Sequence, residues 1–151
     1  MDIYERLKKD HDKQRELARQ IIETTGDSEE RRQLWQQFKI ELEAHASAEE
    51  QTFYATLMEQ PDGSDKARHS VAEHKDAADL VEEIDDMDMS SSGWQRKFSK
   101  LKEEVEHHVD EEEEEVFKLA RKLISAEEAR DLAGRFEERK GAEVDNEKDA
   151  A

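Results

Sequence analysis

Four long segments of this chain carry apolar residues at intervals of three or four positions, the spacing that puts side chains on one face of an α-helix. These segments cover residues 2–24, 28–59, 64–87 and 91–124. Short breaks that contain Gly, Pro or Ser lie between them, at Gly26–Ser28, Pro61–Ser64 and Met89–Gly93. Helices joined by short loops pack as antiparallel neighbours. The pattern therefore predicts an all-α protein with an antiparallel up-down-up-down four-helix bundle over residues 1–124.

A weaker amphipathic pattern follows the bundle. Ala129, Leu132, Ala133 and Phe136 share one side of a short fifth helix that we expect over residues 125–140, outside the bundle or across one end of it. From Gly141 onward the sequence is polar, so residues 141–151 are predicted to form a disordered tail.

The composition excludes several classes of partner and compartment. The net charge of −18 repels phosphate backbones, which argues against nucleic-acid binding. No apolar run approaches the ~20 residues that a membrane-spanning helix needs. The chain has no cysteine, so disulfides and thiolate metal sites are excluded, and its first residues do not resemble a signal peptide. We expect a cytoplasmic protein with no membrane partner.

Ionisable residues interrupt the apolar stripes at six positions. They are His11, His45, Glu49, His74, His108 and Glu112. Two His-x-x-x-Glu pairs are among them, and an i, i+4 pair projects from one face of a helix. Glu112 belongs to a run of five glutamates, but it stands four residues after His108 and four before Val116, on the inward face. At ~1.5 Å per residue, the six positions fall in one slab roughly 10 Å thick.

This combination favours a metal site over isolated core residues. A single inward histidine is commonly just a hydrogen-bonded core residue, but six such groups without a cation would include several poorly paired ones, each costing about 1–3 kcal/mol. Imidazoles and carboxylates together suit iron, manganese or zinc, and two carboxylates can bridge two cations. His69 and His107 are interpreted as surface histidines. A ferritin-like site needs Glu-x-x-His on two helices, whereas this spacing occurs once, at Glu104 and His107.

Over residues 2–124 the chain resembles the hemerythrin-like HHE cation-binding domain proteins. The resemblance rests on His11 in Lys-Asp-His-Asp, on the two His-x-x-x-Glu pairs, and on His74 in Glu-His-Lys. It implies a non-haem di-iron centre with two oxo- or hydroxo-bridged iron ions, held by the six residues above, with manganese or zinc as substitutes. The oxygen-carrying hemerythrins have a histidine where Ser70 stands here, and an aspartate five residues after the last histidine instead of Glu112 at four.

The resemblance implies a small diatomic or peroxide ligand. The leading hypothesis is therefore a protein that binds or senses oxygen or a related small oxidant, rather than an enzyme. A redox enzyme that consumes peroxide or nitric oxide, or an iron-handling protein, is the alternative. A metal-free helical interaction module is a third possibility, and the sequence identifies no protein partner.

Overall fold

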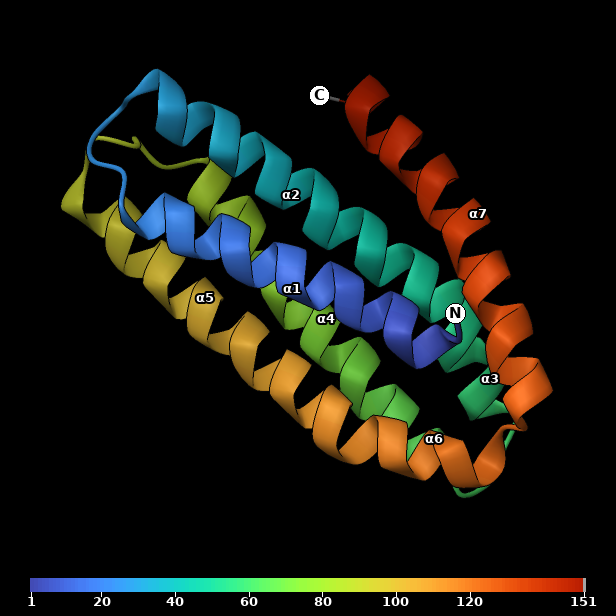
Figure 1. Cartoon of the computed structure of the whole chain (residues 1–151). Coiled ribbons are helices and arrows are strands. Elements are labelled where there is room, and N and C mark those ends of the chain that lie inside the picture. Colours follow the sequence, from blue (N-terminus) through green and yellow to red (C-terminus); the bar gives the residue numbers. More distant parts are fainter. Residues whose placement is uncertain (151) are drawn as a thin grey trace.

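A computed structural model of the protein describes residues 1–150 and confirms the four-helix bundle with an additional C-terminal helix (Figure 1). Its elements are α1 (Ile3–Ile22), α2 (Glu29–Glu49), η1 (Glu50–Tyr54), α3 (Ala55–Met58), α4 (Ser64–Asp85), α5 (Ser92–Glu111), η2 (Glu112–Val116), α6 (Phe117–Leu123) and α7 (Ala126–Ala150). The segments α2, η1 and α3 form one continuous rod, and α5, η2 and α6 form another. None of the helices in residues 1–150 is both long and apolar enough to cross a membrane.

The rods begin where polar side chains satisfy the free backbone N–H groups of a first helical turn. Asp2, Ser28 and Ser91 each accept a hydrogen bond from the backbone N–H three residues further on. Gly26 has a φ of 62°, a left-handed conformation that glycine adopts without steric cost, and it turns the chain from α1 into α2. Local chemistry thus sets where the helices start.

Two π-helical turns, η1 and η2, interrupt the longest rods, and the apolar spacing of the sequence does not predict them. Each lies at the glutamate of a His-x-x-x-Glu pair: η1 directly follows Glu49, and η2 begins at Glu112. A π-helical turn accommodates an extra residue and changes the facing of the residues that follow it. As a result, the consecutive residues Phe53 and Tyr54 are both fully buried.

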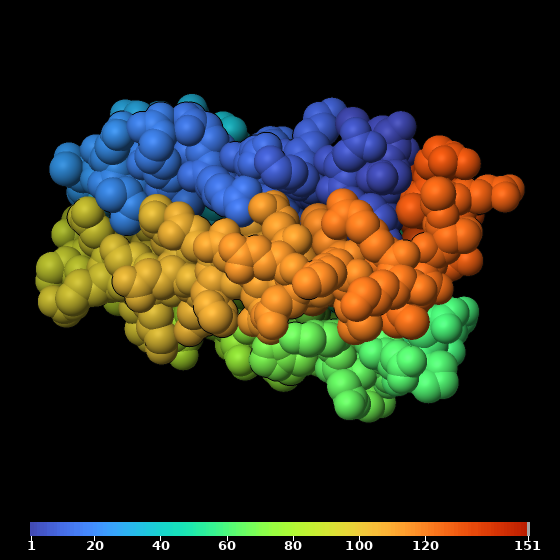
Figure 2. All heavy atoms as spheres, turned by 60° about the horizontal axis from the view of Figure 1, so that its bottom comes forward, coloured from blue at the N-terminus to red at the C-terminus, as the bar shows by residue number. Residues whose placement is uncertain are grey.

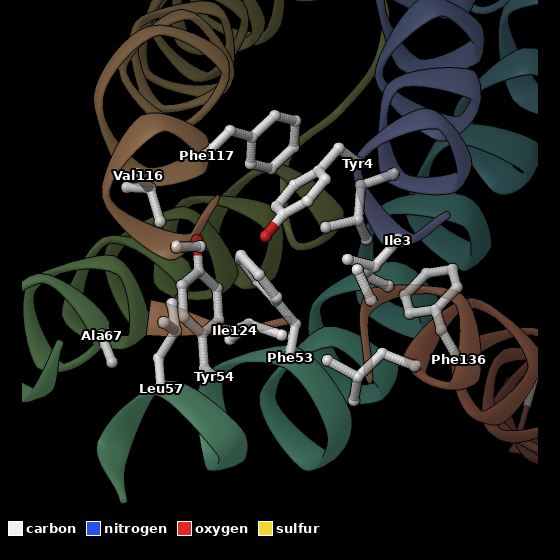
Figure 3. Packing of buried hydrophobic residues seen from close by; sticks show 14 of the residues in the cluster. Ile3, Tyr4, Phe53, Tyr54, Leu57, Ala67, Val116, Phe117, Ile124 and Phe136 are labelled. Carbon is white, nitrogen blue, oxygen red and sulfur yellow. The ribbon is translucent and has the colours of Figure 1, made fainter. Parts of the chain in front are cut away.

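The core consists of two apolar clusters on either side of a polar layer. One cluster packs around Tyr4, Phe53, Tyr54 and Phe117 and is seen from close by in Figure 3. The other packs around aromatic residues that include Trp35, Phe38, Trp94 and Phe98, with the rings of the last two stacked at 5.6 Å. Along each rod, the six ionisable positions lie between these clusters.

Helix α7 packs mainly against α2 and α1. The structure differs here from the sequence-based prediction, because α7 continues through residues 141–150, for which a disordered tail is predicted. Three hydrogen bonds that the sequence does not reveal help to hold the helix: Lys140 Nζ donates to Asp10 and Glu41 at 2.7 Å each, and Gln51 donates to Glu143 at 3.0 Å. Residue 151 lies outside the described residues.

Replacing Lys140 by methionine tests how far α7 contributes to stability. The variant keeps the apolar stem but removes the ammonium group that the buried carboxylates of Asp10 and Glu41 share. We expect Lys140→Met to lower the free energy of unfolding by about 3 kcal/mol, as for breaking a buried ion pair. Urea unfolding measures this, with Lys148→Met on the exposed part of α7 as control. Equal stability of the two variants would contradict the expectation.

Candidate metal centre

The structure brings all six predicted residues together in the middle of the bundle. They form two groups of four, and within each group one ligand atom per residue lies within 4.8 Å of the others. One group contains His11, His45, Glu49 and Glu112, and the other contains Glu49, His74, His108 and Glu112. The two groups share Glu49 and Glu112, which come from the two rods with π-helical turns.

Each shared carboxylate extends one oxygen toward each group. Glu112 Oε1 lies 3.0 Å from His11 Nε2, while its Oε2 lies 3.4 Å from His108 Nε2. Glu49 Oε2 lies 3.5 Å from His45 Nε2, while its Oε1 lies 3.2 Å from His74 Nε2. These oxygens are therefore arranged as in two carboxylates that bridge a pair of adjacent cations.

The opposite ring nitrogen of every inward histidine contacts an acidic side chain. The Nδ1 atoms of His11, His45, His74 and His108 lie 2.7, 2.7, 2.8 and 2.8 Å from Glu113, Asp10, Glu50 and Glu73, respectively. A carboxylate at Nδ1 keeps the proton there and leaves Nε2 free to act as a ligand. Each of the four acids is next in sequence to a predicted ligand but bonds to a histidine of another helix. The apolar spacing does not reveal these partners, although their positions beside the predicted ligands are a visible signal in the sequence.

Several buried atoms at the centre have no hydrogen-bond partner within residues 1–150. They are His11 Nε2, both carboxylate oxygens of Glu49, and Glu112 Oε1. His11 Nε2 and Glu112 Oε1 are close to each other, but their geometry is not that of a hydrogen bond. Such buried, unsatisfied groups are costly. Cations between the carboxylates would satisfy these atoms at once, so the residues present fit a metal pair.

In the metal-free protein, protons partly balance the buried carboxylates. Burial would lower the pKa of His11, but the nearby carboxylate of Glu112, the hydrogen bond with Glu113 and the charge of Glu49 outweigh it and raise the pKa to about 9. The same balance raises the pKa of His74 to about 9 and that of His108 to about 10. Metal binding would displace these protons.

Tyr54, which the sequence analysis did not single out, also reaches the centre. It lies in η1, is fully buried, and its hydroxyl donates to Glu112 Oε2. Figure 3 shows the Tyr54 ring with its hydroxyl directed toward the helix that carries Val116. Burial, followed by the charge of Glu112, raises the pKa of Tyr54 well above 10, so the phenol keeps its proton.

A small cavity of about 30 Å³ adjoins the four histidines. This volume holds one or two water-sized molecules. Leu42, Ala46, His74 and Ala77 line both this cavity and a larger surface groove of about 470 Å³ over α2 and α4. A small ligand could therefore reach the histidines from this side of the bundle.

The raised imidazole pKa values predict that the metal-free protein loses stability at high pH. The contribution of a protonated imidazole paired with carboxylates is fully present below its unfolded pKa of about 6.5, and it is lost as the pH rises through about 9 to 10. We expect the melting temperature of metal-free protein to fall over this range. His74→Gln, which lacks one such imidazole, should show a smaller fall. Equal falls in both proteins would count against this account.

Three comparisons place the chain among known proteins. A search of curated proteins finds no match. Among solved structures, the chain is similar to a hemerythrin HHE cation binding domain-containing protein from Mycobacterium kansasii, with 26% sequence identity and a TM-score of 0.87. The match covers 97% of this chain and 89% of that one. The family model described as Hemerythrin HHE cation binding domain matches residues 2–120, a span that includes all six converging residues. The chain belongs to the hemerythrin HHE cation-binding domain family.

Proposed function

We propose that this protein holds a non-haem pair of iron ions at the bundle centre and binds or senses oxygen or a related small oxidant there. The observation that carries the proposal is the placement of Glu49 and Glu112, each with one oxygen toward each of two ligand groups. Four imidazoles and two carboxylates are a donor set that suits iron, with manganese or zinc as substitutes. Membership in a cation-binding family supports a metal site.

The protein's own residues would hold and shield the metal pair. The four acids at Nδ1 keep each imidazole oriented with Nε2 inward. The two apolar clusters limit solvent on either side of the centre. The small cavity beside the histidines admits a diatomic molecule or peroxide but not a large substrate. When bound, a ferrous pair supplies two electrons to such an oxidant.

One observation favours turnover of peroxide as a second candidate function. Cleavage of a peroxide bond needs a proton donor close to the reacting atoms. Tyr54 is placed to be such a donor, because its buried hydroxyl contacts a carboxylate that we propose as a bridge. The same centre could therefore serve an enzyme rather than a binding protein.

Metal analysis of the purified protein tests the di-iron proposal. We expect two iron ions per chain, together with new near-ultraviolet and visible absorption when anaerobic protein is exposed to air. Glu49→Gln should lower the iron content to one ion or none, since it removes charge from both ligand groups. Glu114→Gln, an exposed change of the same charge, serves as control. Stoichiometric zinc without iron, or an unchanged iron content in Glu49→Gln, would overturn the proposal.

Peroxide consumption separates the two candidate functions. If Tyr54 donates a proton during turnover, Tyr54→Phe should keep two iron ions but consume peroxide about 100-fold more slowly, within the usual range for a general acid. The reduction of one equivalent of peroxide per ferrous centre, without further turnover in the wild type, would instead support binding or sensing. Equal multiple-turnover rates in both proteins would exclude Tyr54 as the donor.

A further inference from the structure

The chain has six histidines, and the two that lie outside the centre form pairs of their own. His69 precedes Glu73 by four residues on α4, and His107 precedes Glu111 by four residues on α5. The helices α4 and α5 are packed neighbours. Figure 2 shows α5 in yellow and orange across this face of the molecule, with α4 in green beneath it. We call His69, Glu73, His107 and Glu111 the outer cluster.

The side chains of the outer cluster converge across the gap between the two helices. His69 Nε2 lies 3.6 Å from Glu73 Oε1 on its own helix and 3.4 Å from Glu111 Oε1 on the other. His107 Nε2 lies 3.4 Å from the second oxygen of Glu111. One ligand atom from each of His69, Glu73 and Glu111 lies within 4.8 Å of the others. Three potential metal ligands from two helices thus lie close together.

The distances are those of ligands around a cation rather than of hydrogen bonds. In the centre, the histidine Nδ1 atoms lie 2.7–2.8 Å from their carboxylates, as hydrogen bonds do. Donor atoms that bind one tetrahedral cation at about 2.1 Å each are separated by about 3.4 Å. The contacts of His69, at 3.4 and 3.6 Å, match this spacing. His69 Nε2 is thus spaced from both carboxylates as a ligand that shares one cation with them would be.

Exposure and charge make the outer cluster reachable for cations. The side chains of His69 and His107 are 54% and 72% exposed, whereas those of Glu73 and Glu111 are largely covered. A surface hollow of about 330 Å³ adjoins the cluster, and acidic residues predominate in its lining: Glu73, Asp76, Glu103, Glu104 and His107. A hollow of this charge raises the local concentration of cations.

The outer cluster is also connected to the centre through one carboxylate. Glu73 Oε1 contacts His69 and also accepts a hydrogen bond from Nδ1 of His108, one of the six residues of the centre. We propose that the outer cluster binds a divalent first-row cation at the surface and is the entry site from which cations reach the buried centre. The entry role rests on the proposed di-iron function, whereas binding at the surface does not.

Equilibrium dialysis against Co²⁺ tests the surface site, using full-length protein already loaded with iron. We expect one cobalt ion per chain in addition to the iron. His69→Gln should weaken cobalt binding at least about tenfold, the lower end of what even an outer-shell change costs a metal site. Glu111→Gln should weaken it similarly, while the exposed change Glu114→Gln should not.

Each outcome of this experiment bears on one proposal. The absence of stoichiometric cobalt in the wild type, or unchanged affinity in His69→Gln, would overturn the surface site. Protein that binds cobalt in the outer cluster but never contains two iron ions would contradict the di-iron proposal and leave the surface site intact.

The rate at which the centre fills tests the entry role. Metal-free protein is mixed with limiting Fe²⁺ in air, and the rise of visible absorption is followed. We expect His69→Gln to fill more slowly than wild type but to reach the same final iron content when Fe²⁺ is in excess. Filling at the wild-type rate would overturn the entry role.

Discussion

Burying six imidazole and carboxylate groups in the middle of a bundle is costly, and the remainder of the structure compensates for that cost. Every inward histidine has an acidic partner at Nδ1, and two of those acids, Asp10 and Glu113, have cationic partners in turn. Asp10, which contacts His45, is itself bound by Arg6 and by Lys140 of α7. Helix α7 is thereby connected to the centre, and the two apolar clusters enclose the polar layer on both sides.

The two rods that contain π-helical turns have matching features at the centre. Each rod carries a His-x-x-x-Glu pair and a π-helical turn at its glutamate. Glu49 and Glu112 therefore lie close to each other, and each carboxylate belongs to both ligand groups. π-helical turns are frequent at functional sites, because the extra residue changes which side chains face inward. Here the turn after Glu49 brings Tyr54 to Glu112.

The helices and the six converging residues could be predicted because both depend on local geometry. Apolar spacing predicts which side of a helix is buried, and a histidine on that side must point inward with it. The π-helical turns could not be predicted in this way, since the regular spacing of Phe53 and Leu57 continues through η1. Tyr54 was missed for that reason. The length of α7 was missed because Lys140 appears as an ordinary charged residue until its two buried carboxylate partners are known.

The exposure of His69 and His107 could be predicted from the sequence, but their contacts could not. Their sequence positions place them off the inward faces of their helices, and the structure agrees that both are exposed. Their meeting at Glu111 depends on the relative rotation and height of α4 and α5. The four-helix bundle and its inward-facing groups could be predicted from the apolar spacing within each helix, since that spacing is a property of a single segment. Contacts between helices, including every acid at Nδ1 and the outer cluster, came from the packing of the whole bundle, which sets neighbours and rotations that no single segment encodes.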